Sequence, residues 1–227
     1  MEGPGFGGKV GGLPAHASLG HALAARLGTY RDRDDVVVLA LGRGGALIAF
    51  DIARALRVPM DVFVVRTLGA PGTPELSIGV IASGGTMVLN EDLIAYLGLT
   101  RREVDLVRAG EERELERCER AYRGDRPMLG VFKKTVIVVD DGLATNATLR
   151  VAIRALRELA PAHLVLAMPV AAPGLSSDVR HQVDKLVCLS ASDPLRAVGL
   201  IGDSFDPISD TEIEHLLKWA PRRRTSP

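Results

Sequence analysis

The sequence has few cysteines and no long apolar segment. Only 2 cysteines occur among 227 residues, whereas small secreted domains that depend on disulfides carry many more. We therefore interpret Cys118 and Cys188 as small buried hydrophobic residues. No apolar run approaches the roughly 20 residues of a membrane-spanning helix, and the N-terminus lacks the basic-then-apolar order of a signal peptide. These absences predict a cytoplasmic protein that does not enter a membrane.

An excess of charge of either sign is also missing. Lysine and arginine together number 28, as do aspartate and glutamate, so the formal net charge is zero. Nucleic-acid-binding domains usually show a basic excess or stripe, so we expect no nucleic-acid partner. The sequence has no His-Glu-x-x-His motif, no cysteine pair with metal spacing and no Gly-x-Ser-x-Gly nucleophile motif. Zinc hydrolase and serine hydrolase chemistry therefore have no support in the sequence.

The length and the distribution of glycine and proline indicate a single domain between two tails. A chain of 227 residues can form one generous domain. Residues 1–16 are rich in glycine at their start and are predicted to be a flexible N-terminal tail. Residues 17–219 are predicted to form the domain. Residues 220–227 are a polar C-terminal tail, or alternatively a linker into a fused C-terminal domain.

Short apolar runs alternate with segments that have helical spacing. Such runs are typical of strands covered on both faces, so the pattern predicts an α/β fold with a mostly parallel central sheet flanked by helices. A hairpin is predicted where two further runs flank Ser83-Gly84-Gly85. The predicted strands are Val36–Leu41, Asp61–Val65, Ser77–Ala82, Thr86–Leu89, Thr135–Val139, Leu164–Met168 and Leu186–Leu189. The predicted helices are Leu19–Arg26, Leu47–Leu56, 100–122, Thr148–Leu159 and 209–219. The helices at 100–122 and 209–219 open on the capping boxes Thr100/Glu103 and Ser209/Glu212.

The segment Val136–Thr148 joins a buried strand to a helix through two acids and a small turn. Backbone N–H groups at the start of a helix bind anions, and Thr145 and Thr148 can add hydroxyl donors. Adjacent carboxylates repel each other unless a ligand binds them, and ribose hydroxyls or a divalent cation would do so. The motif therefore predicts a ligand with a phosphate, a diol and Mg²⁺. The alternative is purely structural, with Asp140 capping the helix and Asp141 exposed.

A glycine turn, Leu41–Ala46, follows the first strand and opens a helix. It does not complete the dinucleotide-binding pattern G-x-G-x-x-G, because Leu47 stands at the last glycine position. It is not a P-loop either, since no Gly-Lys-Ser/Thr follows. A plain tight turn is one interpretation. The other follows from its position, because sites in parallel sheets lie at the carboxyl ends of the strands.

The strand, acid pair and turn of Val136–Thr148 resemble the phosphoribosyl pyrophosphate (PRPP) signature of the type I phosphoribosyltransferases. The resemblance implies that Asp140 and Asp141 contact the ribose hydroxyls. Asn146 stands where the family usually has glycine, and asparagine tolerates the left-handed conformation better than most residues. The implied 5′-phosphate loop consists of Ala144, Thr145, Asn146, Ala147 and Thr148.

The first glycine turn resembles the pyrophosphate-binding loop of the same family. The resemblance implies that Arg43, Gly44 and Gly45 bind pyrophosphate, with Arg66 as a further contact. The alternative for Arg66, at the end of a predicted strand, is an ion pair with a structural carboxylate. Together with the segment 65–76, this turn resembles a bacterial subgroup of predicted phosphoribosyltransferases, over about residues 19–217. Thr67 and Gly42 stand where that subgroup has lysine and proline.

In this family the segment 65–76 would lead into a flexible loop that closes over PRPP. A small hood over the acceptor is expected within residues 171–209, lined by Phe205 and Asp206. The 6-oxopurine enzymes of the family have an aspartate at the position of Ala144, so the sequence argues against that subclass. Homodimers are common in the family, and a homodimer is expected here.

The resemblance implies transfer of phosphoribose from PRPP to an unidentified nitrogenous acceptor, with release of pyrophosphate. Asp140, Asp141 and Arg43 are the predicted catalytic residues, and Mg²⁺ would bind mainly through PRPP with the two aspartates as its protein ligands. The alternative is a catalytically weak or inactive domain that binds PRPP or a nucleotide for regulation. Three features favour this alternative, namely Thr67, Asn146 and the linker-like tail; Thr67 removes a cation from the expected pyrophosphate site. A third hypothesis is a phosphoester hydrolase that uses the acid pair.

Overall fold

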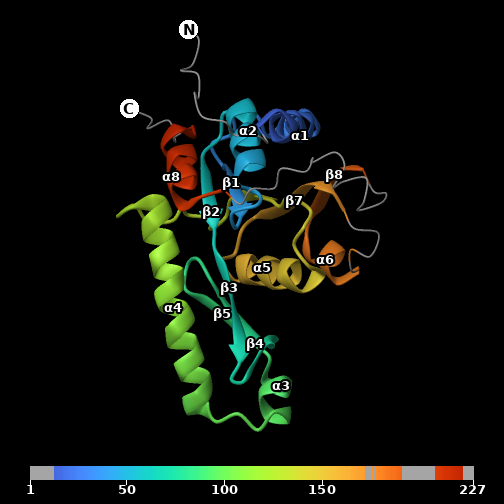
Figure 1. The fold of residues 1–227 in the computed structure, drawn as a ribbon. Coiled ribbons are helices and arrows are strands. Elements are labelled where there is room, and N and C mark those ends of the chain that lie inside the picture. Colours follow the sequence, from blue (N-terminus) through green and yellow to red (C-terminus); the bar gives the residue numbers. More distant parts are fainter. Residues whose placement is uncertain (1–12, 172–174, 176, 191–207, 222–227) are drawn as a thin grey trace.

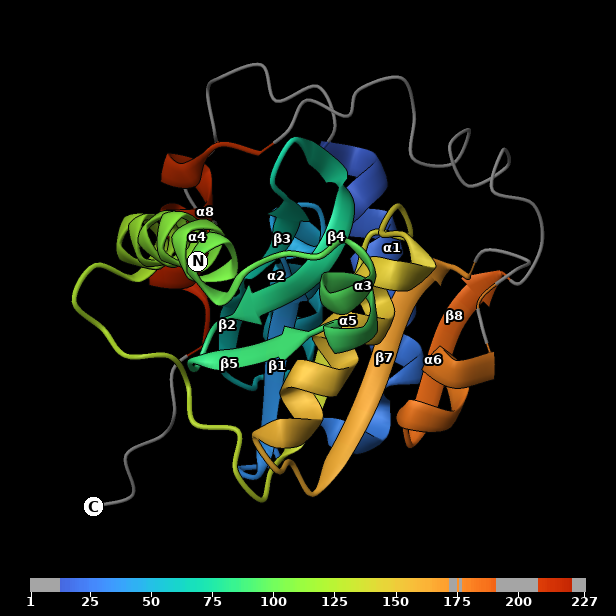
Figure 2. The same cartoon turned by 90° about the horizontal axis from the view of Figure 1, so that it is seen from below.

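The computed structural model describes residues 13–171, 175, 177–190 and 208–221. Its centre is a 5-stranded sheet with the strand order β2-β1-β6-β7-β8. Figure 2 shows β2 and β1 on one side of this sheet and β7 and β8 on the other. All four neighbouring pairs are parallel, which confirms the predicted fold class. The strands are β1 (Val36–Leu41), β2 (Met60–Phe63), β6 (Thr135–Val139), β7 (His163–Val170) and β8 (Lys185–Ser190).

Helices cover both faces of this sheet (Figure 1). One face is covered by α1 (Leu13–Arg26), α2 (Ala46–Leu56) and α8 (Asp210–Trp219), and a 3₁₀ turn at Gly28–Tyr30 follows α1. The opposite face is covered by α5 (Asn146–Glu158) and α6 (Ser177–Gln182). None of the helices in the described part of the chain is long and apolar enough to cross a membrane.

Alternate residues of the buried strands face two separate hydrophobic cores. In β1, Val36, Val38 and Ala40 pack into the core beneath α1, α2 and α8. Val37, Leu39 and Leu41 pack into the core beneath α5 and α6. Side chains of a strand alternate between the two faces of the sheet, so a strand covered on both faces must be apolar at every position. This explains the unbroken apolar runs in the sequence.

A second, antiparallel sheet projects from the main body along the long helix α4 (Figure 1). The hairpin predicted around Ser83-Gly84-Gly85 is present within it. The segment expected to lead into a flexible loop instead forms two paired strands, with irregular register around Gly69. The elements are β3 (Val65–Ala70), β4 (Thr73–Ala82), β5 (Thr86–Leu89), α3 (Glu91–Tyr96) and α4 (Arg101–Arg123).

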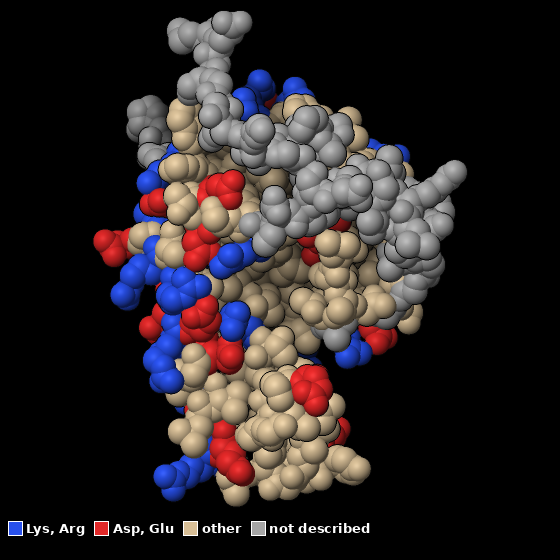
Figure 3. Space-filling view, viewed as in Figure 1, with Lys and Arg blue, Asp and Glu red and all other residues tan. Residues whose placement is uncertain are grey.

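The outer face of α4 is covered with charged side chains of both signs. Figure 3 shows acidic and basic groups interspersed along this helix. Several of them form ion pairs one turn apart, among them Arg108 with Asp105 and Glu112, and Arg117 with Glu114. Such pairs are typical of a solvated helix face.

Several predicted boundaries need correction. The strand predicted over 61–65 ends at Phe63, because Val64 turns away and its N–H and C=O both bond to Ser83. Helix α1 begins at Leu13, so residues 13–16 are helical and not part of a tail; Pro14 lies in the first turn, where proline is tolerated. Helix α3, which was not predicted, is capped by the Asn90 side chain.

The region expected to be a hood is partly described. Its residues 177–190 contain α6 and β8, and β8 is the edge strand of the main sheet. A strand paired in the central sheet is not a hood, so that boundary is corrected. Phe205 and Asp206 lie outside the described residues.

Candidate functional site

The two junctions predicted from sequence meet at the carboxyl ends of neighbouring strands of the main sheet. Strands β1 and β6 pair in parallel with Ala40 opposite Val139, so the glycine turn and the acid pair leave the sheet side by side. A Cβ atom on Gly44 would lie 1.9 Å from the Asp141 Oδ2 atom. A Cβ on Gly45 would lie 2.2 Å from the Val139 carbonyl oxygen. Only glycine permits this close approach, so the turn and the acid pair form one site.

The acid pair is buried. Asp140 is 3% exposed and Asp141 is 7% exposed. The N–H of Gly142 donates to Asp140 Oδ2 at 2.8 Å, and the N–H of Leu143 donates to Asp141 Oδ1 at 2.9 Å. The structural alternative, in which Asp140 caps the helix and Asp141 is exposed, is therefore wrong.

The environment of Asp140 favours its protonated form. Burial, and then the adjacent carboxylate of Asp141, raise the pKa of Asp140 to about 7. The backbone N–H groups of Gly142 and Ala144 oppose this shift only in part. A carboxyl group with a strongly raised pKa in such a position is typical of functional sites, because a bound cation or a hydrogen-bonding ligand can restore its ionised form.

The predicted phosphate turn forms the start of helix α5. Thr145 is the N-cap, and its Oγ1 accepts from the Thr148 N–H at 3.2 Å and lies 3.0 Å from the Thr148 Oγ1. Asn146 and Ala147 lie in the first turn of α5, and Ala144 packs against the core beneath that helix. The N–H groups and dipole of such a first turn favour an anion.

Two departures from the resembled subgroup have a structural explanation. Asn146 is the first residue of α5 and is not among the residues with positive φ, so the left-handed conformation considered for it is not needed. Gly42 has a φ of +61°. Proline is fixed near −65° and cannot adopt that value, so this turn requires a residue other than proline.

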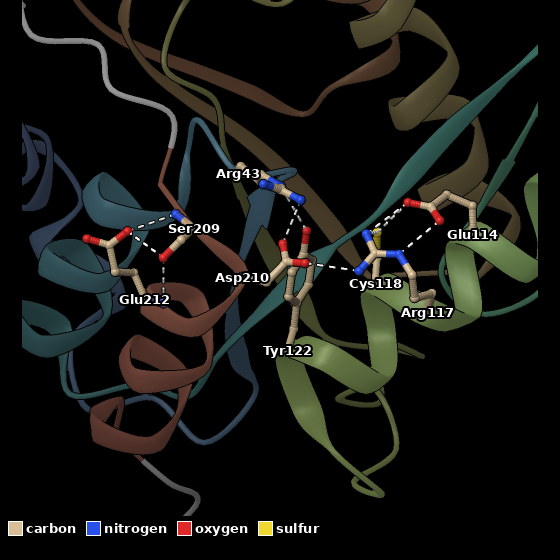
Figure 4. A network of polar contacts seen from close by, with 8 residues as sticks. All are labelled: Arg43, Glu114, Arg117, Cys118, Tyr122, Ser209, Asp210 and Glu212. Carbon is tan, nitrogen blue, oxygen red and sulfur yellow. Dashed lines mark hydrogen bonds and ion pairs between the residues drawn. The ribbon is translucent and has the colours of Figure 1, made fainter.

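The two arginines predicted to bind pyrophosphate have other partners in this structure. The Arg43 Nε donates to the Tyr122 hydroxyl at 3.2 Å, and its Nη2 lies 2.6 Å from Asp210 Oδ1 (Figure 4). Arg66 is the second residue of β3 and does not end a strand; it pairs with Glu111 of α4 at 2.8 Å. The backbone of the glycine turn therefore lies at the acid pair while the Arg43 guanidinium is bound to α4 and α8.

Tyr122 and Asp210 were not identified from the sequence. Tyr122 was noted only as the end of a helix, and Asp210 only as lying within a capping box. Residues so far from the glycine turn in sequence give no local signal of contact with Arg43. Their role depends on how α4 and α8 pack, which the apolar pattern does not specify.

The described residues contain no group of three or more His, Cys, Asp or Glu side chains arranged to hold a metal ion. The acid pair nevertheless offers carboxylate oxygens, the donors that Mg²⁺ prefers. Because the neighbouring negative charge raises the pKa of Asp140, a cation here would relieve repulsion. The pair fits a metal ion whose other ligands come from a bound substrate.

Known proteins resemble this chain over most of its length. The family model described as "Phosphoribosyl transferase domain" matches residues 14–200. A Mycobacterium tuberculosis protein, provisionally named a phosphoribosyl transferase in strains CDC 1551 and H37Rv, is 36% identical over 203 residues. This match covers 89% of the chain but 46% of the relative, so the chain spans about half of the relative's length.

A solved structure shares the fold of this chain. The crystal structure of a protein from Thermus thermophilus is 32% identical and superposes with a TM-score of 0.72, covering 92% of this chain and 97% of that one. The residues that the family model matches include both junctions of the site and the strands of the main sheet. The chain therefore belongs to the phosphoribosyl transferase domain family.

Proposed function

We propose that this domain binds PRPP with Mg²⁺ and transfers phosphoribose to a nitrogenous acceptor, with release of pyrophosphate. The observation that carries the proposal is the approach of Gly44 to Asp141, which joins the glycine turn to the acid pair. Family membership supports the proposal independently.

The arrangement provides a separate binding element for each part of PRPP. The first turn of α5, with the Thr145 and Thr148 hydroxyls, would bind the 5′-phosphate. Asp140 and Asp141 would accept hydrogen bonds from the ribose 2′ and 3′ hydroxyls. The amides of the glycine turn would bind the diphosphate, so that the three elements fix the orientation of the sugar.

In the reaction the bond from the anomeric carbon to the diphosphate oxygen breaks, and a bond from that carbon to the acceptor nitrogen forms. Positive charge develops on the ribose meanwhile, and the carboxylates of Asp140 and Asp141 would stabilise it. The acceptor nitrogen loses a proton, and the diphosphate leaves with the bonding electron pair. Bound Mg²⁺ would supply neutralisation of the diphosphate charge, with the acid pair as its protein ligands.

Arg43 can assist the departing diphosphate only if it leaves its partners on α4 and α8. Arg66 is paired with Glu111, so the proposal does not depend on it. Thr67 is exposed on β3 and brings no positive charge. These three observations favour a second candidate function, a weak or inactive domain that binds PRPP or a nucleotide for regulation.

Calorimetric titration with PRPP, with and without Mg²⁺, tests the binding shared by both candidates. We expect saturable, Mg²⁺-dependent binding by the wild type and a loss of at least about tenfold in Asp140→Asn and Asp141→Asn, since each loses a charge-assisted hydrogen bond to the ribose. Glu214→Gln on α8 is the matched control, because it removes one negative charge from a surface pair with Lys218. Absence of binding by the wild type would contradict both candidates.

Pyrophosphate release across a panel of nitrogenous bases then separates the two candidates. Release that depends on a particular base identifies the enzyme and its acceptor, and release without any base indicates hydrolysis. Ala144 predicts that 6-oxopurines are not the preferred acceptors. If no base supports release, Thr67→Lys is the decisive variant: a gain in turnover identifies a weakened enzyme, and none indicates the regulatory domain.

Assembly is a separate part of the proposal. We expect a homodimer and, in a longer natural protein, a domain fused to this one. Sedimentation of the purified chain tests the first expectation.

A further inference from the structure

The Arg43 side chain connects the glycine turn to two helices. Its guanidinium contacts the Tyr122 hydroxyl on α4 and the Asp210 carboxylate on α8 (Figure 4). Gly44, the next residue, lies against Asp141 in the site. The backbone of this turn therefore belongs to the proposed diphosphate site, while the positive charge carried by the same turn is neutralised by a carboxylate of the protein itself.

Asp210 has a second cationic partner. Arg117 Nη1 lies 3.1 Å from Asp210 Oδ2, and Arg117 also binds Glu114 on its own helix (Figure 4). The cluster holds two guanidinium groups and two carboxylates, so its formal charge is balanced. If Arg43 turned away, the Asp210 carboxylate would keep its ion pair with Arg117. Release of Arg43 would therefore not leave an unpaired charge on α8.

Release of Arg43 does not require α8 to move. The helix is anchored by Ile213 and Leu217, which are buried in the core shared with α2 and α4. The capping box of Ser209 and Glu212 fixes its first turn. The Arg43 side chain is 43% exposed and that of Asp210 is half-buried at 28%, so the pair still contacts solvent, and ion pairs near the surface are weak. A diphosphate offers more charge and more acceptor oxygens than one carboxylate, and planar guanidinium groups bind such anions well.

We propose that Asp210 sets the affinity of the site for diphosphate by competing with it for Arg43. This inference rests on the proposed function, because it assigns a specificity role within the same site. In the absence of ligand, Asp210 and Tyr122 hold Arg43; a bound diphosphate takes Arg43 from them. Asp210 thereby lowers the affinity of the site for every ligand that carries a diphosphate, and it leaves the affinity for other ligands unchanged.

Titration of Mg²⁺-pyrophosphate and of ribose 5-phosphate into wild type and Asp210→Asn tests this competition. Asparagine keeps the shape of the side chain and removes its charge. We expect Asp210→Asn to bind pyrophosphate about twofold to fivefold more tightly, the range for loss of one ion pair near the surface, with ribose 5-phosphate affinity unchanged. Glu214→Gln, with the same charge change on the same helix, should match the wild type for both ligands.

Two further variants test whether the effect passes through Arg43. Tyr122→Phe removes the other contact that holds Arg43 without altering the charge, and should tighten pyrophosphate binding by about twofold to threefold. It also provides an answer if Asp210→Asn is poorly folded. In the double variant Arg43→Ala/Asp210→Asn, the gain from the Asp210 change should vanish.

Each result decides the inference. Equal or weaker pyrophosphate binding by Asp210→Asn and Tyr122→Phe would show that Asp210 supports the turn and does not compete. That failure leaves the proposed function intact if the wild type still binds PRPP through Asp140 and Asp141. If neither PRPP nor pyrophosphate binds to any of these proteins, both the inference and the proposed function fall.

Discussion

Two buried carboxylate sites in this molecule are built in opposite ways. Asp61 on β2 pairs with Arg123 of α4 at 2.7 Å, and both side chains are 5% exposed. The backbone N–H groups of Val62 and Leu129 also donate to Asp61. Asp140, by contrast, has a second carboxylate beside it, and among the described residues no cation contributes to the shift of its pKa.

The difference separates a structural carboxylate from one that we propose binds a ligand. The Asp61–Arg123 pair connects α4 to the main sheet, because Arg123 also donates to the Val62 carbonyl oxygen of β2. A further bond to Glu119, within α4, holds the guanidinium in place. A buried carboxylate that the protein itself neutralises and hydrogen-bonds gains little from binding a ligand. A buried carboxyl group beside a second one is destabilising by itself and is relieved by a ligand.

Breaking the structural pair should have the largest effect. Arg123→Ala leaves the Asp61 carboxylate buried without its cation, so the free energy of unfolding should fall by about 3–5 kcal/mol. Urea denaturation measures this loss. Lys218→Ala, which breaks an exposed pair with Glu214, is the control and should cost less than about 1 kcal/mol. A loss in Arg123→Ala no larger than in this control would contradict the structural role.

Crowding the functional pair should have a smaller effect on stability but a clear effect on binding. Gly44→Ala places a Cβ against the Asp141 carboxylate, and such overpacking costs about 1–3 kcal/mol. PRPP binding should weaken because the glycine turn is displaced from the acid pair. Gly110→Ala is the matched control: no atom lies within 4 Å of its added Cβ in α4, so it should stabilise the helix by up to about 1 kcal/mol. Unchanged PRPP affinity in Gly44→Ala would argue against a joint site.

Removing the charge of Asp140 should stabilise the protein at alkaline pH. The folded-state pKa of about 7 lies above the unfolded value of 3.8, so the folded protein binds the extra proton between these values. Wild-type stability therefore decreases as pH rises from about 4 to 7, whereas Asp140→Asn lacks this decrease. We expect the variant to gain about 1–2 kcal/mol over wild type between pH 5 and pH 8, given about 1.4 kcal/mol per pKa unit and partial relaxation of the site. Parallel stability curves for the two proteins would show that Asp140 is not destabilised by burial.

The smallest effect concerns the helix beside the acid pair. Thr145→Ala removes the N-cap hydrogen bond to the Thr148 N–H and should lower the free energy of unfolding by about 1 kcal/mol. Ser209→Ala removes the corresponding cap of α8 and should cost a similar amount. Only Thr145→Ala should also weaken ribose 5-phosphate binding. An equal effect of the two variants on that ligand would remove Thr145 from the proposed phosphate site.

Most of the main sheet could be predicted from sequence because its strands are apolar at most positions. β1 and β6 have the predicted boundaries, and both capping boxes start helices as expected. These features depend on local chemistry, namely side-chain pattern and hydrogen bonding within a few residues. Helix α3 escaped prediction because it is only 6 residues long, so Leu93 and Ile94, which pack against the core, are too few to show helical spacing.

The candidate site was predictable in its backbone but not in its side-chain partners. The order of strand, acids and turn predicts that Asp140 and Asp141 lie at the carboxyl end of a strand of the sheet. The partners of Arg43 could not be predicted, because contact with Tyr122 and Asp210 depends on the packing of helices far away in sequence. The pyrophosphate role of Arg66 follows from the family resemblance alone, whereas in the structure Arg66 lies within β3 and pairs with the Glu111 carboxylate of α4, as the structural alternative predicts.

The pairing of β1 with β6 has a consequence for folding. It joins residues as distant as Ala40 and Val139, with the whole antiparallel sheet and α4 between them in sequence. Closing so long a loop carries an entropic cost, and such contacts form late in proteins with non-local topology. The glycine turn and the acid pair therefore meet only when β1 and β6 have paired. Under the proposed function, PRPP binding during refolding would then require this non-local pairing.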